Sequence, residues 1–118
     1  MKILVVEDDD VARELMRMAL ERQGYEVAAA EDGVRGYELA VEVRPNLIIT
    51  DIRMPAADGV YLVRRVRDTP EIESTPILVT TGFGTGDATF SLMQGADAYE
   101  PKPINPTSLL ESVRRLLS

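Results

Sequence analysis

The stretch LIITD at residues 47–51 joins a short aliphatic run, Leu47 to Thr50, to a single carboxylate, Asp51. Two further runs, Ile3 to Val6 and Ile77 to Thr80, have the same aliphatic and β-branched character. Runs of this length and composition are typical of parallel strands that are buried on both faces of a sheet. Two weaker runs are Glu26 to Ala30 and Ala98 to Tyr99. We therefore expect three central strands between two edge strands.

Amphipathic stretches alternate with these runs, which predicts an α/β domain with helices on both faces of a parallel sheet. Each stretch is bounded by capping residues, glycine or proline. In the first stretch, helical spacing relates Val11, Leu15, Met18 and Leu20-Glu21-Arg22. The expected helices run from Asp9 or Asp10 to Gly24, from Asp32-Gly33 to about Val43, from Asp58-Gly59 to the loop between Pro70 and Pro76, across Asp87 to Gln94 with the weakest pattern, and from Pro106 to Leu117.

The amino-acid composition restricts the possible chemistry. The chain is expected to form one domain, 1–118, and it contains no cysteine, histidine or tryptophan. Disulfides, thiolate or histidine metal sites and histidine catalysis are therefore excluded, and the lack of cysteine fits a cytoplasmic protein. The formal net charge of −7 argues against binding of nucleic acid or an anionic membrane. No apolar run approaches the roughly 20 residues that a membrane span needs.

Polar side chains follow the ends of the expected strands. Glu7 and Asp8 follow the first strand, Asp51 the third, Thr81 the fourth and Lys102 the fifth. Each residue alone could be a helix cap, a turn residue or a surface charge. In open α/β sheets, however, ligands collect beyond the carboxyl ends of the strands, so these side chains should meet at one edge. Clustered acids need a cation, and Mg²⁺ prefers oxygen ligands, which points to phosphoryl chemistry.

Four segments in this order resemble the receiver domain of bacterial two-component response regulators of the chemotaxis-regulator type. The segments are Ile3 to Asp8, Asp51 to Pro55 with Asp58-Gly59 after it, Pro76 to Gly82, and Gly95 to Pro103. The resemblance covers essentially the whole chain and implies a flavodoxin-like (βα)5 three-layer sandwich with the strand order 2-1-3-4-5. It also implies a phosphoacceptor of a cytoplasmic phosphorelay, which catalyses only its own phosphorylation and dephosphorylation.

The resemblance assigns roles to the acids at the strand ends. Asp51 would accept a phosphoryl group from the phosphohistidine of a sensor histidine kinase or a phosphotransfer protein. The cofactor would be Mg²⁺, which Asp8 would touch directly and Glu7 through a water molecule. Asp51 and the backbone carbonyl of Arg53 would complete the protein ligands.

Thr81 and Lys102 would be the catalytic groups that contact the phosphoryl oxygens, since a hydroxyl and an ammonium help to offset the negative charge of a phosphate. The family holds the Lys102-Pro103 bond cis, with an ordinary trans bond as the alternative. Arg53 and Phe83 match positions that tune phosphate lifetime, and their bulk predicts slow self-dephosphorylation.

Thr81 and Tyr99 match the switch pair of the family, in which the hydroxyl moves toward the phosphate and the ring swings inward. Tyr99 could instead be an ordinary edge-strand aromatic residue. The expected fourth helix, fifth strand and fifth helix would form the output surface, with a downstream protein target and a possible homodimer as partners. Neither direct nucleic acid binding nor a membrane is expected.

Two other classes of protein remain open. A Mg²⁺-dependent phosphatase or phosphotransferase with an aspartyl intermediate usually has a second acid two residues after the nucleophile, where this chain has Arg53. A flavodoxin-like small-molecule binder would place a flavin phosphate against the carboxylates, which would repel it. A dinucleotide-binding motif in the glycine-rich segment Gly82 to Gly86 fails because its last position is Asp87.

Overall fold

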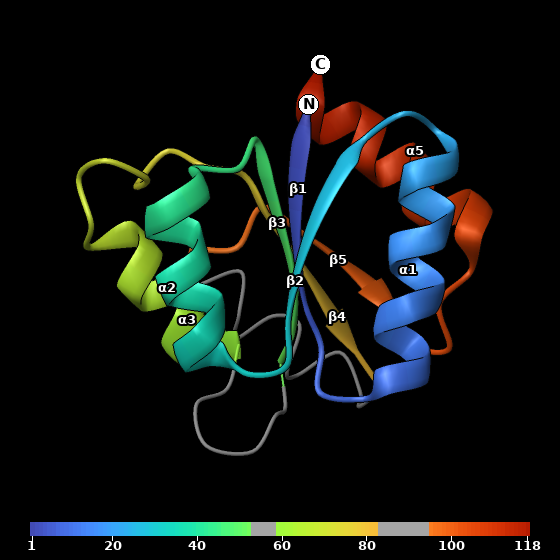
Figure 1. Ribbon diagram of the computed structural model, residues 1–118, viewed down its shortest axis with the longest axis horizontal. Coiled ribbons are helices and arrows are strands. Elements are labelled where there is room, and N and C mark those ends of the chain that lie inside the picture. The colour runs from blue at the N-terminus through green and yellow to red at the C-terminus, as the bar shows by residue number, and fades with distance from the viewer. Residues whose placement is uncertain (53–58, 83–94) are drawn as a thin grey trace.

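The computed structural model describes residues 1–52, 59–82 and 95–118, which form one five-stranded parallel sheet with helices on both faces (Figure 1). The strand order is β2-β1-β3-β4-β5, as predicted. The strands are β1 (Lys2–Val6), β2 (Glu26–Ala30), β3 (Leu47–Asp51), β4 (Ile77–Thr81) and β5 (Ala98–Pro101). The helices described are α1 (Asp10–Arg22), α2 (Gly33–Val43), α3 (Gly59–Arg67) and α5 (Pro106–Leu117). Within these ranges, no helix combines the length and hydrophobicity that crossing a bilayer requires.

Two hydrophobic clusters fill the space on the two faces of the sheet. On one face, strand residues such as Leu4 pack with Leu62 of α3. On the other face, strand residues such as Ile49 pack with Leu20 of α1 and Leu109 of α5. Figure 1 shows α2 and α3 together on one side of the sheet and α1 and α5 on the other. Because successive side chains of a strand point to opposite faces, each aliphatic run supplies both clusters.

The central position of the three aliphatic runs is confirmed. Every residue of β3 and β4 is buried, and in β1 only Lys2 is partly exposed. The two weaker runs form the edge strands β2 and β5. Strand β5 continues beyond the expected run to Glu100 and Pro101, which are paired with the last residues of β4.

Three helices begin at a side chain that accepts a backbone N–H of the first turn. The capping residues are Asp9, Asp32 and Asn105. Pro106 occupies the first turn of α5, where its missing N–H leaves no bond unmade. Gly24 follows α1 with a φ of +91°, which favours glycine. The limits predicted for these helices are thus confirmed, whereas Asp58 and the expected helix at 87–94 lie outside the described residues.

Of the apolar residues that the sequence predicted to share a face of α1, only Leu20 is buried. Val11 and Leu15 are 67% and 61% exposed, and Met18 is exposed as well. Leu20 packs against the sheet together with Met16, which the prediction did not include. Helical spacing shows which residues share a face of a helix, but α1 has two apolar faces and only one of them can meet the sheet. We call Val11, Leu15 and Met18 the α1 stripe.

Candidate functional site

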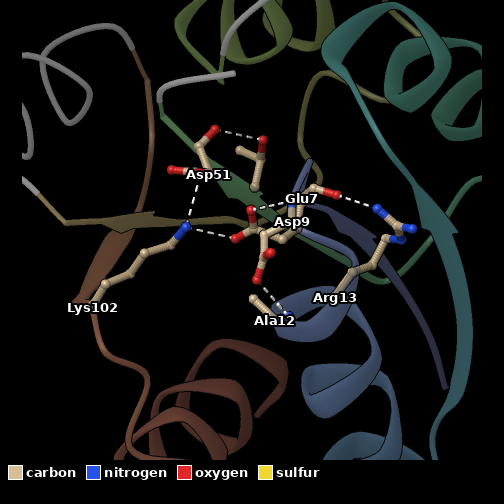
Figure 2. A network of polar contacts seen from close by, with 7 residues as sticks. Glu7, Asp9, Ala12, Arg13, Asp51 and Lys102 are labelled. Atoms are coloured by element: carbon tan, nitrogen blue, oxygen red, sulfur yellow. Dashed lines mark hydrogen bonds and ion pairs between the residues drawn. The ribbon is translucent and has the colours of Figure 1, made fainter. Parts of the chain in front are cut away.

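The carboxyl edge of the sheet brings Glu7, Asp51 and Lys102 together, as Figure 2 shows. Glu7 follows β1, Asp51 ends β3, and Lys102 follows β5. β4 separates β3 from β5, so the lysine side chain reaches past β4 to the acids. Glu7 is fully buried and Asp51 is 6% exposed. The expected convergence of these three side chains is therefore observed.

Three carboxylates form a compact acidic cluster at this edge. Ligand oxygens of Glu7, Asp8 and Asp51 all lie within 4.8 Å of one another, and Asp8 is exposed to solvent. Such charges repel one another, and a divalent cation that prefers oxygen ligands would remove the repulsion. Within the described residues, the polar contact of the buried Glu7 Oε1 is the Lys102 ammonium, at 2.7 Å. The donor set therefore fits a hard metal ion. Arg53, whose backbone carbonyl was expected to complete the ligands, lies outside the described residues.

Lys102 links the two buried acids. Its Nζ lies 2.7 Å from Glu7 Oε1 and 2.9 Å from Asp51 Oδ2 (Figure 2). Its backbone N–H donates to the carbonyl oxygen of Thr81 at 2.7 Å, and the Lys102-Pro103 peptide is cis, as the resemblance implies. Burial by itself would lower the pKa of Lys102, but hydrogen bonds to both carboxylates and their charges outweigh it, so the pKa is raised. The ammonium is therefore charged at neutral pH.

Glu7 is held through both its side chain and its main chain. The Asp9 N–H donates to Glu7 Oε2 at 3.1 Å, and the Arg13 guanidinium donates to the Glu7 carbonyl oxygen at 2.8 Å (Figure 2). Burial raises the pKa of Glu7, and the charge of Asp51 adds to this effect. The Lys102 ammonium and the Asp9 N–H act in the opposite direction without cancelling it. Glu7 therefore binds a proton at a higher pH than an ordinary glutamate.

The other predicted site residues are placed as follows. Thr81 is buried at the end of β4, in register with Pro101. Tyr99 is 41% exposed on β5, in register with Val79. An exposed ring is compatible both with the outward position of a switch residue and with an ordinary edge-strand aromatic. Phe83 lies outside the described residues.

Sequence reasoning missed two residues that shape the site. Gly59 packs so closely on the end of β3 that a Cβ there would lie 2.2 Å from the Asp51 carbonyl oxygen. In the sequence, Gly59 was part of a segment that carries the family resemblance and the first residue of an expected helix, where a weak cap also explains a glycine. Arg13 contacts the Glu7 carbonyl oxygen, but a cation one turn into a helix usually indicates only a surface ion pair.

A groove of about 460 Å³ lies beside the site between α1 and the segment leading into α5. The α1 stripe lines it, together with Ile104 and Leu109. Lys102, whose ammonium contacts Glu7 and Asp51, is also part of the lining. An exposed apolar surface thus borders the reactive edge of the sheet.

Known proteins share this fold and this arrangement of strands. A family model described as the response regulator receiver domain matches residues 3–114. The chain is 40% identical over 117 residues to the transcriptional regulatory protein CseB of Streptomyces coelicolor, covering 98% of this chain and 48% of CseB. It is 36% identical over 117 residues to the DNA-binding dual master transcriptional regulator RpaA of Synechocystis sp., covering 98% of this chain and 48% of RpaA. The chain therefore spans about half the length of these curated relatives.

A solved structure shows the same likeness. The receiver domain of the sensor histidine kinase PA1611 from Pseudomonas aeruginosa PAO1 matches with a TM-score of 0.91 at 29% identity, over 98% of this chain and 96% of that chain. In that structure, a magnesium ion is coordinated in the active-site cleft.

These relatives contradict the expectation that nucleic acid is not a partner. RpaA is named as a DNA-binding regulator, and CseB as a transcriptional regulatory protein. The expectation rested on the net charge of −7 carried by these 118 residues. Both relatives are about twice as long, and the charge of one domain does not describe the remainder of a longer chain. Excluding nucleic acid as a partner was therefore wrong.

Proposed function

The chain belongs to the response regulator receiver domain family of two-component systems, and from this membership we propose that Asp51 accepts a phosphoryl group from the phosphohistidine of a partner protein. The observation that carries the proposal is the position of the Asp51 carboxylate, 2.9 Å from the Lys102 ammonium and beside two further acids. A nearly buried acid that pairs with a cation at the carboxyl edge of an α/β sheet is a reactive group rather than a surface charge.

The transfer makes one bond and breaks one. A carboxylate oxygen of Asp51 bonds to phosphorus while the bond from phosphorus to the donor nitrogen breaks, and the electrons of that bond return to the imidazole. A carboxylate is a weak nucleophile, so stabilisation of charge on the phosphoryl oxygens must supply most of the rate. Lys102 is positioned to do this, and the Thr81 hydroxyl would be the second donor.

Mg²⁺ is the proposed cofactor. Glu7, Asp8, Asp51 and the backbone carbonyl of Arg53 would hold it. When bound, it would offset the negative charge that a phosphoryl group brings to an acidic edge. The chain has no histidine or cysteine to favour a softer metal, and the magnesium ion bound by the PA1611 receiver domain supports the same choice.

The apolar groove favours a protein as the phosphoryl donor. The α1 stripe and Ile104 leave a large apolar surface next to Lys102. A partner that delivers a phosphohistidine to Asp51 would cover this surface, and burial of apolar area would stabilise the complex. A histidine kinase or a phosphotransfer protein is therefore the proposed direct partner.

The domain would act as a switch and would catalyse only its own phosphorylation and dephosphorylation, in the cytoplasm. Thr81 and Tyr99 would change position on phosphorylation and alter the surface around β5 and α5, to which a target protein or a second copy would bind. Arg53 and Phe83 would slow hydrolysis of the phosphate. Unchanged decay in Arg53→Asn and Phe83→Glu would remove the assigned effect of these two residues.

Incubation with Mg²⁺ and acetyl phosphate, followed by mass spectrometry, tests the proposed function. We expect one phosphoryl group per chain, stable in acid and labile in base, as an acyl phosphate should be. Asp51→Asn should accept none, whereas the exposed control Asp68→Asn should behave as the wild type. Continuous phosphate release over many turnovers would support the phosphatase class instead. Absence of any reaction would refute the proposal.

A further inference from the structure

A buried carboxylate joins β5 to α5 on the face of the sheet that α1 and α5 cover. Glu100 of β5 is 8% exposed. Its carboxylate accepts hydrogen bonds from Ser108 Oγ at 2.9 and 3.0 Å and from Ser112 Oγ at 2.7 Å. Both serines belong to α5, and Ser112 is itself buried. We call Glu100, Ser108 and Ser112 the β5–α5 clamp.

Joining a strand to a helix through a buried carboxylate costs free energy, because the charge is removed from water. In the part of the chain that the structure describes, no ion pair involves Glu100, and the partners of its carboxylate are neutral hydroxyls. The Arg115 guanidinium donates to Ser112 Oγ at 3.4 Å, so its link to Glu100 runs through Ser112. An apolar side chain of similar volume would fill such a position at less cost than a buried carboxylate. What hydrogen bonds add over apolar contacts is a fixed direction and distance.

The end of β5 has few other restraints among the described residues. Within that part of the chain, the edge strand β5 pairs with β4 alone, and its last residue, Pro101, has no N–H to donate to the ladder. Lys102 follows at once, and its Nζ must reach both Glu7 and Asp51. The backbone bond from Lys102 to Thr81 fixes the strand end in the plane of the sheet. The clamp fixes it against the helix that covers it (Figure 1).

We propose that Glu100 is a positioning residue for Lys102: the β5–α5 clamp holds the end of β5 so that the Lys102 ammonium stays between Glu7 and Asp51. This inference rests on the proposed function for its consequence, because Lys102 is the group that would stabilise the transferring phosphoryl. Glu100 and Lys102 are separated by Pro101 alone, the last residue of β5, so a shift of the strand end at Glu100 also displaces the backbone of Lys102. The clamp thus acts on the reaction through Lys102 and does not contact the phosphoryl group.

The test compares Glu100→Met with Glu100→Gln and with the matched control Glu111→Met, an exposed acid on α5. We expect Glu100→Met to slow phosphorylation by acetyl phosphate by about tenfold, since small displacements of a catalytic group have effects of this size. Its urea midpoint should stay near that of the wild type. Glu100→Gln can still accept and donate hydrogen bonds with the serines and should recover most of the rate. Glu111→Met should change nothing.

A second measurement reports on Lys102 itself. The chain contains only two lysines, Lys2 and Lys102, so protein labelled with ¹³C at the lysine side chains gives two sets of NMR signals. In Glu100→Met the Lys102 signals should move toward those of Lys2, which serves as an internal reference at the opposite end of β1. If Glu100→Met does not fold, the double variant Ser108→Ala with Ser112→Ala takes its place, with the same expected rate and NMR shift but a lower urea midpoint, because the buried carboxylate loses its donors.

The two measurements separate the possible failures. Wild-type rates and unmoved Lys102 signals in Glu100→Met would overturn the inference. So would a loss of rate that equals the unfolded fraction of the variant, because the clamp would then be structural only. If the wild type itself takes no phosphoryl group, the proposed function fails, and the Lys102 signals alone decide whether the clamp positions the lysine.

Discussion

Gly59, the first residue of α3, packs directly on the backbone of Asp51, the last residue of β3. A Cβ at Gly59 would lie 2.2 Å from the Asp51 carbonyl oxygen and 2.9 Å from Ile52 Cα. The Gly59 N–H donates to the Ile52 carbonyl oxygen at 2.8 Å. The start of the helix and the end of the strand therefore occupy a space that admits only a hydrogen atom, and the position of the Asp51 carboxylate depends on this contact.

We predict that Gly59→Ala lowers the free energy of unfolding by about 3 kcal/mol, because the added methyl group meets backbone that can move only if β3 moves. Urea denaturation followed by far-ultraviolet circular dichroism measures the change. Gly82→Ala is the matched control, since its Cβ would lie 3.7 Å from Lys102 Cβ in ordinary contact. The control should lose less than about 1 kcal/mol. Similar losses in both variants would show that the close approach at Gly59 is unimportant.

Replacement of Lys102 should affect metal binding and phosphorylation in opposite directions. In Lys102→Met the ammonium no longer competes for the oxygens of Glu7 and Asp51, so Mg²⁺ should bind more tightly. Phosphorylation by acetyl phosphate should slow by about a hundredfold, because the phosphoryl oxygens lose a positive partner. Isothermal titration calorimetry and mass spectrometry measure the two effects. Lys2→Met, at the other end of the sheet, is the control, and weaker Mg²⁺ binding in Lys102→Met would contradict this prediction.

The raised pKa of Glu7 predicts a pH dependence of Mg²⁺ affinity. Mg²⁺ binds the ionised carboxylate, so a proton on Glu7 competes with the metal. Because burial raises the pKa of Glu7, this competition should begin at a higher pH than for an ordinary glutamate, and Mg²⁺ affinity should fall as the pH is lowered through the raised pKa. Mg²⁺ titrations at a series of pH values measure it. Glu7→Gln should bind Mg²⁺ more weakly and with a smaller pH dependence. An equally steep pH dependence in Glu7→Gln would show that a group other than Glu7 causes it.

The same pKa shift predicts the sign of a stability change in the absence of metal. The folded state binds a proton at Glu7 more tightly than the unfolded chain does. This proton therefore adds fully to the free energy of unfolding below the pKa of Glu7 in the unfolded chain. The contribution is lost as the pH rises through the raised pKa of Glu7 in the folded state. Urea midpoints of the wild type and of Glu7→Gln, measured without Mg²⁺ across this range, should converge at low pH if the shift is as described. A constant difference between the two urea midpoints at every pH would contradict the raised pKa of Glu7.

The α1 stripe should matter for a protein donor and not for a small one. We predict that Leu15→Ser reduces phosphotransfer from a phosphorylated histidine kinase by about tenfold, because an anchor residue at a protein interface is lost. Phosphorylation by acetyl phosphate should not change. Val41→Ser removes an exposed apolar residue from α2, on the other face of the sheet, and is the control. Equal slowing with both donors would mean that Leu15 acts on the site itself and not on docking.

The strands and the acidic edge could be predicted because local sequence determines both. Aliphatic runs form central strands wherever helices can cover them, and parallel strands place the residues that follow them at a common edge. The buried face of α1 could not be predicted in this way, since Leu15 and Leu20 are equally apolar and only the packed helix distinguishes them. Glu100 was missed for a related reason. A glutamate after a short run indicates the end of a strand, and it is buried only because serines 8 and 12 residues later face it from α5.

Both termini lie at the amino edge of the sheet. The Glu26 N–H donates to the Met1 carbonyl oxygen, and Leu116 and Leu117 pack against the same hydrophobic cluster as Tyr25 and Val27. Figure 1 shows the two ends near each other, at the rim opposite the one where β1, β3 and β4 end. An affinity tag or a fluorescent protein fused to either terminus would therefore emerge away from Asp51. The domain could be anchored to a sensor chip by such a fusion while the phosphodonor still reaches the free rim.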